Sequence, residues 1–142
     1  MRTTIMIIGI VLAFVVLAPP VGAQTDLRLD LWVKNLNHPQ LAVRKSAVRK
    51  LGELGDKRAV EHLLPLLNAE KTVIRRLSAG SLGQIKDPSA IGALKKVALN
   101  DNQKSVRRAA ARAAETLQLV LEREQAEEEK ARQQEQEQAK RG

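Results

Sequence analysis

The sequence predicts an all-α fold, a short α-solenoid of about three helix pairs whose last helix extends into a charged tail. Its main support is an internal repeat, because the segment from Val43 to Asp56 recurs from Ile74 to Asp87 at an offset of 31 residues. A repeat of about 30 residues with two helices per unit is typical of stacked helical arrays. Composition agrees, since Trp32 is the only aromatic residue after position 23, and a core of small aliphatic residues suits close-packed helices better than sheets.

The first 23 residues have the layout of a secretory signal peptide. An unbroken apolar run from Ile5 to Ala18 ends at Pro19-Pro20, and Val21 to Ala23 offers small residues at the cleavage site. We therefore expect cleavage after Ala23 and export, to the periplasm or to the outside of the cell. An uncleaved inner-membrane anchor is the alternative, although a spanning helix needs about 20 apolar residues.

Apolar residues at helical spacing divide the rest of the chain into six predicted helices. In the last of them Val106, Ala110, Ala113 and Leu117 lie on one helix face. The helices are expected near residues 26–36, 41–54, 57–67, 71–85, 88–99 and from 103 onward, which defines a domain over 24–118 with units of about 27–56, 57–87 and 88–118.

Polar residues and prolines mark the boundaries between these helices. Asp56 and Asp87 are predicted N-caps, and Pro88 takes the first helical position after the second of them. Pro65 lies inside the third predicted helix, where it removes a backbone donor and predicts a kink.

The repeated pattern resembles a known family. The first unit contains Val43-Arg44, Leu51-Gly52, a turn with Asp56, and then Ala-Val before a Leu-rich helix. This pattern is similar to HEAT repeats, and closest to the short HEAT-like type first named for phycobilisome lyases. The resemblance covers about residues 27–118. It implies a right-handed stack of antiparallel helix pairs, with the second helices lining one face. It also implies a protein-binding role, since most members of the family bind proteins and only a minority are enzymes.

The third copy departs from this pattern. Ala114-Glu115 stands where Leu51-Gly52 and Leu82-Gly83 stand in the first two units. Glycine lets a following helix approach closely and glutamate does not, so we expect the stack to end here. Residues 119–142 form a tail of mixed charge that is either an extension of the last helix or a disordered end, because a helix that is polar all round has no face to bury.

Two columns of basic residues recur with the repeat. Arg44, Arg75 and Arg107 hold one position, and we expect them to bond to the turns between paired helices as a structural ladder, since similar ladders recur in HEAT repeats. A second set of Lys and Arg residues, next to these arginines, is expected to point toward the open side of the second helices. This set predicts a basic strip that attracts an acidic partner. We call Lys45, Arg49, Arg76, Arg108 and Arg112 the basic strip; the alternative is a solvated face that only keeps the protein soluble.

Trp32 is expected to pack in the first helix pair, where it aligns with Leu63 and Leu94. A partner anchor is the competing interpretation, because Trp is enriched at binding hot spots. The first helix also carries Leu27 and Leu31, more apolar residues than one buried face requires, so another subunit or a membrane surface is a candidate neighbour.

The sequence offers no set of residues for catalysis, a cofactor or a metal. It has no cysteine, and its two histidines, His38 and His62, have no ligand partner at metal-binding spacing. With Trp32 as the one mature aromatic residue, stacking platforms for single-stranded nucleic acid are missing, which argues against that partner.

We therefore expect a non-enzymatic, exported scaffold or adaptor that binds another protein through the second-helix face. The alternative is a membrane-tethered structural spacer whose N-terminal segment stays on the protein. The sequence leaves the oligomeric state and the identity of the partner open.

Overall fold

The computed structural model describes the backbone of residues 21–141 and the side chains of residues 24–141. The predicted signal peptide falls outside this range, apart from the backbone of its last three residues. Within the described residues the structure contains helices and no strand. The α-helices are α2 (Val21–Asn35), α3 (Leu41–Leu54), α4 (Val60–Leu63), α5 (Thr72–Ile85), α6 (Ile91–Asn100) and α7 (Lys104–Arg141).

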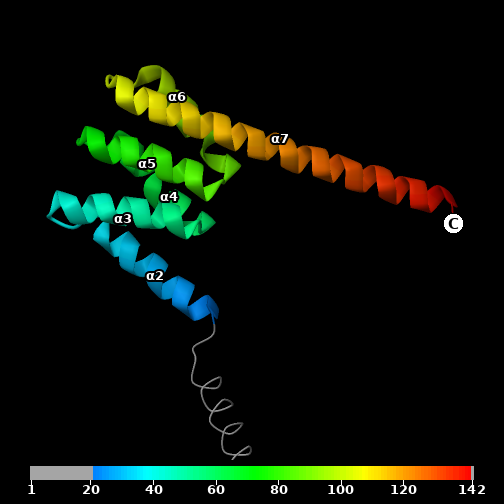
Figure 1. Cartoon of the computed structure of the whole chain (residues 1–142), viewed down its shortest axis with the longest axis horizontal. Coiled ribbons are helices and arrows are strands. Elements are labelled where there is room, and N and C mark those ends of the chain that lie inside the picture. The colour runs from blue at the N-terminus through cyan, green and yellow to red at the C-terminus, as the bar shows by residue number, and fades with distance from the viewer. Residues whose placement is uncertain (1–20, 142) are drawn as a thin grey trace, which may run out of the picture.

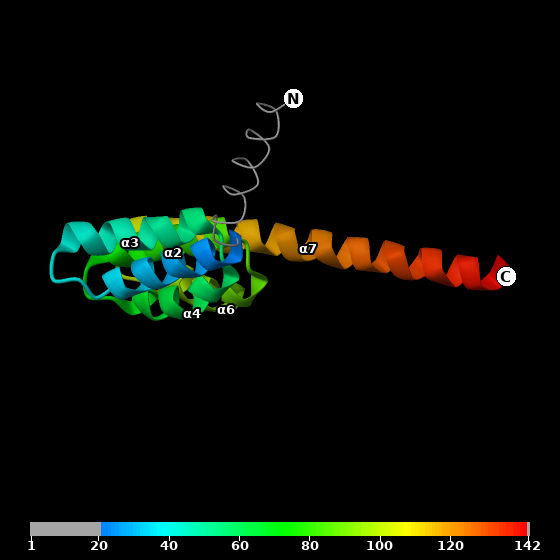
Figure 2. The same cartoon turned by 90° about the horizontal axis from the view of Figure 1, so that it is seen from below.

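The helices stack as pairs in two layers. Figure 1 shows α3, α5 and α7 side by side, with α5 between the other two. Figure 2 shows the first helices of the pairs, α2, α4 and α6, beneath this layer of second helices. This arrangement confirms the predicted short all-α solenoid with its extended last helix.

Aspartates begin the second and third repeats as predicted. The side chains of Asp56 and Asp87 each accept a hydrogen bond from a backbone N–H two residues later, both at 2.9 Å. The turn that follows each aspartate is 3₁₀ rather than α, at Lys57–Ala59 and Pro88–Ala90. Pro65 interrupts its helix more strongly than a kink, because α4 ends at Leu63 and Pro65–Asn68 continues as a 3₁₀ turn.

The first described helix begins earlier than predicted, at Val21 rather than near residue 26. No proline lies between Pro20 and Pro39, so the sequence has no strong helix breaker until the turn before α3.

A single core runs through the stack between the two layers. Each helix from α3 to α7 contributes one fully buried leucine, namely Leu51, Leu63, Leu82, Leu94 and Leu117. Glycines set the helix spacing in the second-helix layer. A Cβ on Gly52 would lie 2.8 Å from Cβ of Ser81, and one on Gly83 would lie 3.1 Å from Cβ of Ala113. The close approach expected at the two Leu-Gly positions is therefore present.

The last helix continues well past the core. Leu117 is its final buried residue, and the side chains from Glu122 to Arg141 are all exposed. The described tail is thus one continuous helix, the first of the two predicted alternatives. Among residues 21–141 we find no helix with the length and apolar character that crossing a membrane requires.

Candidate functional site

Three arginines bind the turns of the stack in the same way. In each unit Nη1 of the arginine donates to the carbonyl oxygen of the residue six positions earlier, so the bond closes the loop between the paired helices. The bonds are Arg44 to His38 at 2.7 Å, Arg75 to Ala69 at 3.0 Å and Arg107 to Asp101 at 2.8 Å. The geometry is that of a structural ladder.

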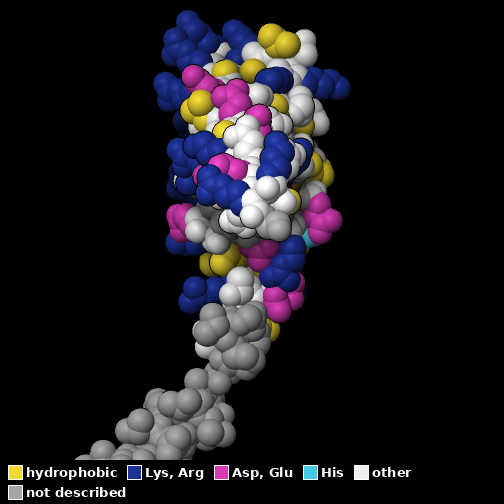
Figure 3. Space-filling view, turned by 90° about the vertical axis from the view of Figure 1, so that its right-hand side faces the viewer, with side chains coloured by type: hydrophobic (Ala, Val, Ile, Leu, Met, Phe, Trp, Pro, Cys, Tyr) yellow, Lys and Arg dark blue, Asp and Glu magenta, His cyan; other side chains and the backbone are white. Residues whose placement is uncertain are grey.

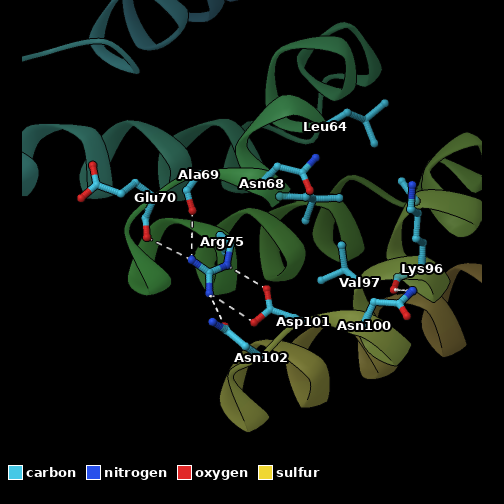
Figure 4. Close-up of a pocket in the computed structure, with 12 residues that line it drawn as sticks. Leu64, Asn68, Ala69, Glu70, Arg75, Lys96, Val97, Asn100, Asp101 and Asn102 are labelled. Carbon is cyan, nitrogen blue, oxygen red and sulfur yellow. Dashed lines mark hydrogen bonds and ion pairs between the residues drawn. The ribbon is translucent and has the colours of Figure 1, made fainter.

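Arg75 also reaches into the next unit (Figure 4). Its Nε donates to Oδ2 of Asp101 at 2.8 Å, and its Nη2 donates to Oδ1 of Asp101 and to Oδ1 of Asn102. With the carbonyls of Ala69 and Glu70 these bonds occupy all five guanidinium N–H groups. Arg75 is therefore committed to holding the second and third units together.

Burial strengthens this contact. The Arg75 and Asp101 side chains are only 12% and 8% exposed. The hydrogen bonds from Arg75 hold the pKa of the Asp101 carboxyl below its usual range, and the backbone N–H of Gln103 acts in the same direction. The pair lines an open pocket of about 700 Å³ at the turns between the units. The Arg75 guanidinium, whose N–H groups are all used by the protein itself, offers no free donor to a ligand in this pocket.

The basic strip lies on the outer side of the second-helix layer. Its residues come from α3, α5 and α7 at equivalent repeat positions. Lys45 is half-buried, and Arg49, Arg76, Arg108 and Arg112 are exposed. Figure 3 looks at the stack from the side toward which α7 extends, and Lys and Arg side chains gather along its left edge, the side of the second helices.

The strip arginines are not neutralised by the chain itself. Across residues 24–141 no ion pair within 4.0 Å involves a strip residue, although eight such pairs form elsewhere. Glu53, the nearest acidic side chain along α3, pairs with Lys50 at 2.7 Å. The strip thus presents uncompensated positive charge to solvent.

An open groove crosses the strip between α3 and α5. Its walls are Arg49 and Glu53 from α3 and Arg76 and Gln84 from α5, and Gly80 lies between them. Two neighbouring helices build this groove together, and sequence reasoning did not find it. The available signal was the repeat alignment, in which Gly80 takes the position of Arg49 and Arg112.

Trp32 lies at the outer end of the stack. It is half-buried, packs against the core and lines a hollow between α2 and α3 with Leu31 and Leu54. Leu27 and Leu31 on the same helix are 70% and 52% exposed. The structure therefore places Trp32 where it contacts the core and also borders an apolar surface.

The histidines take part in local contacts. Nδ1 of His38 accepts from the backbone N–H of Gln40 at 3.1 Å, and Nε2 of His62 lies 3.4 Å from Glu61. In the described part of the chain no group of three or more His, Asp or Glu side chains is arranged to hold a metal ion.

The arrangement described above defines a helical-repeat protein, in which paired helices stack through neighbouring units. Comparison with protein families agrees, because the family of HEAT repeats matches residues 29–115. The chain belongs to the HEAT-repeat family. This match does not distinguish the short HEAT-like type from other HEAT repeats, and comparison with curated proteins finds no significant match.

Proposed function

We propose that this protein is an exported HEAT-repeat scaffold or adaptor that binds an acidic protein partner through its second-helix face. HEAT repeats generally mediate protein–protein interaction. The observation that carries the proposal is the contrast between two sets of arginines. Those of the ladder are bonded to the protein itself, whereas those of the strip have no ion-pair partner among the described residues.

The stack acts as a rigid support for the strip. Because α5 packs directly against both α3 and α7, the backbone positions that carry the basic side chains of different repeats keep a fixed spacing. A rigid surface loses little conformational entropy on binding, which favours affinity. Its positive charge attracts an acidic partner at long range and limits the orientations in which the two proteins meet.

Charge reversal on the strip tests this function. Arg76→Glu combined with Arg108→Glu should abolish cross-linking to the partner in cells, from a photo-reactive residue at the exposed position Ser46, as read by mass spectrometry. Lys34→Glu combined with Lys96→Glu is the matched control, because it makes the same change in net charge on the first-helix layer. Circular dichroism should show that both variants fold. If the strip variant still cross-links to the partner as the wild type does, the basic strip is not the binding surface.

Export rests on the sequence of residues 1–23. We propose cleavage after Ala23, which makes Gln24 the first residue of the mature protein. The alternative, a membrane-tethered spacer, gains support from the long polar extension of α7, which has the form of a spacer. N-terminal sequencing of protein from cells separates the two, because Gln24 as the first residue excludes the tether.

A further inference from the structure

Three glycines lie inside the second helices, and two of them have a packing reason. Gly52 and Gly83 lie where the next helix approaches too closely for a Cβ to fit without movement. Gly80 has no such reason, because a Cβ there would meet no atom within 4 Å and its backbone does not need a positive φ. Glycine inside a helix costs roughly 0.5–1 kcal/mol relative to alanine. Packing therefore does not explain the glycine at position 80.

The position of Gly80 suggests a different role. In the repeat alignment Gly80 stands between Arg49 on α3 and Arg112 on α7, so it interrupts a row of basic side chains at its centre. Arg49 and Arg76 flank the resulting groove, and neither guanidinium group has a hydrogen bond or ion pair among the described residues. The groove thus combines free space with two free guanidinium groups.

Two other polar groups of the groove are already engaged within the protein. Glu53 pairs with Lys50, and the hydroxyl of Ser81 donates to the backbone carbonyl of Val48 at 2.8 Å. The groups left for a ligand are the two guanidinium groups and the side-chain amide of Gln84. The guanidinium groups carry the charge and favour carboxylates, because a guanidinium can bind both carboxylate oxygens at once and an amide N–H can donate to the same group.

We propose that the Gly80 groove receives one aspartate or glutamate side chain of the partner protein, which pairs with Arg49 and Arg76. This inference rests on the proposed function and names the contact at the centre of it. The missing side chain at position 80 gives the carboxylate room to enter between α3 and α5. The rest of the basic strip attracts the acidic segment around that residue.

Filling the groove tests the inference without removing any charge. Gly80→Gln places a neutral side chain in the groove and improves helix propensity. Gly92→Gln is the matched control, because Gly92 lies inside α6 on the other layer and a Cβ there also meets no atom within 4 Å. Both variants should unfold at the same or a higher urea concentration than the wild type, which shows that neither disturbs the fold.

Binding is measured with a defined probe, a fluorescein-labelled alanine-based helical peptide with glutamates along one face, by fluorescence anisotropy at low salt. We expect Gly80→Gln to weaken binding by about tenfold or more, the scale of one charge-assisted hydrogen-bond pair. Gly92→Gln should bind as the wild type does. The same peptide with glutamine in place of glutamate should bind neither variant nor the wild type.

The outcomes separate the groove from the strip. If Arg76→Glu with Arg108→Glu abolishes binding while Gly80→Gln binds like the wild type, the groove is rejected and the strip remains. If the wild type does not prefer the glutamate peptide to the glutamine peptide, the groove is also rejected, whereas the cross-linking result at Ser46 still decides the proposed function.

Discussion

Arg75 and Asp101 lie 26 residues apart in the sequence, and Nε of Arg75 donates to Oδ2 of Asp101 at 2.8 Å across the boundary between two repeats. Each repeat of a solenoid contacts only its neighbours, so such boundaries limit the stability of the whole array. The first boundary has a weaker counterpart. Ala69, which has no carboxylate, holds the position of Asp101 one unit earlier; the next residue, Glu70, pairs with Lys71 at 3.0 Å, and Arg44 bonds only to its own turn.

The two ladder arginines should therefore differ in their contribution to stability. Arg75→Ala leaves a buried carboxylate without its partner and should lower the free energy of unfolding by about 3 kcal/mol. Arg44→Ala removes bonds to two carbonyls only and should cost about 1 kcal/mol. Urea unfolding followed by circular dichroism measures both. A double-mutant cycle with Asp101→Asn checks the cause, because additive losses would show that Arg75 and Asp101 do not interact.

Acid should weaken the same boundary. The pKa of Asp101 is depressed in the folded protein, whereas an aspartate in the unfolded chain titrates near 3.9. Its contribution is complete above that pH and is lost as the pH falls through the folded pKa. Asp101→Asn should therefore reduce stability at neutral pH, and its difference from the wild type should shrink below about pH 4. A difference that stays constant over this range would contradict the assignment.

Two glycines in the second helices should respond oppositely to alanine. Gly52→Ala forces a Cβ to within 2.8 Å of Ser81 and should lower the free energy of unfolding by about 1–3 kcal/mol. Gly80→Ala meets open space and should raise it by about 0.5–1 kcal/mol. Urea unfolding of the two variants gives the comparison, and a gain for Gly52→Ala would mean that α3 and α5 separate at little cost.

The end of α5 holds a strained residue that can be relieved. Lys86 adopts a left-handed conformation, φ 60°, at the position that Gly55 occupies with φ 68° at the end of α3. A left-handed backbone costs a residue with a Cβ roughly 1–2 kcal/mol. Lys86→Gly should stabilise the protein by about 1 kcal/mol, and Gly55→Ala should destabilise it by a similar amount. Thermal unfolding checks both variants. A Lys86→Gly variant with the same unfolding midpoint as the wild type would show that the backbone at Lys86 is not strained.

Ser78 is a polar residue in an apolar position. Its side chain is fully buried, and its hydroxyl has no hydrogen-bond partner in the described part of the chain. The equivalent positions in the other two units are Ala47 and Ala110, both fully buried. Ser78→Ala should raise the free energy of unfolding by about 1 kcal/mol, because it removes an unsatisfied buried group. A loss of stability would show that the hydroxyl finds a partner in solution.

The repeat made most of the fold predictable. A helix pair cannot bury its apolar face alone, so the same apolar positions and aspartate caps recur in each unit and locate the helices. The contact between Arg75 and Asp101 was harder to predict, because it depends on how two units stack rather than on spacing within one. The tail stayed ambiguous for a different reason, since residues from Glu122 onward lack an apolar stripe and local helix propensity is their only guide.

The candidate site was predictable in part. The repeat alignment identified the columns of basic residues, but burial and bonding separate their roles. The guanidinium of Arg75 uses all of its N–H groups, and the guanidinium of its neighbour Arg76 has none engaged within the described residues. Adjacent residues on a helix differ by about 100° in direction, which turns one toward the loops and the other toward solvent.

The continuity of α7 has a mechanical consequence. The same helix supplies Val106 and Leu117 to the core and then projects about 30 Å further, from Glu122 to Arg141, with no glycine or proline along its length. A load applied to the far end therefore reaches the last repeat without a hinge to absorb it. Force along the projecting helix would be opposed by the packing of α7 against α5 and α6.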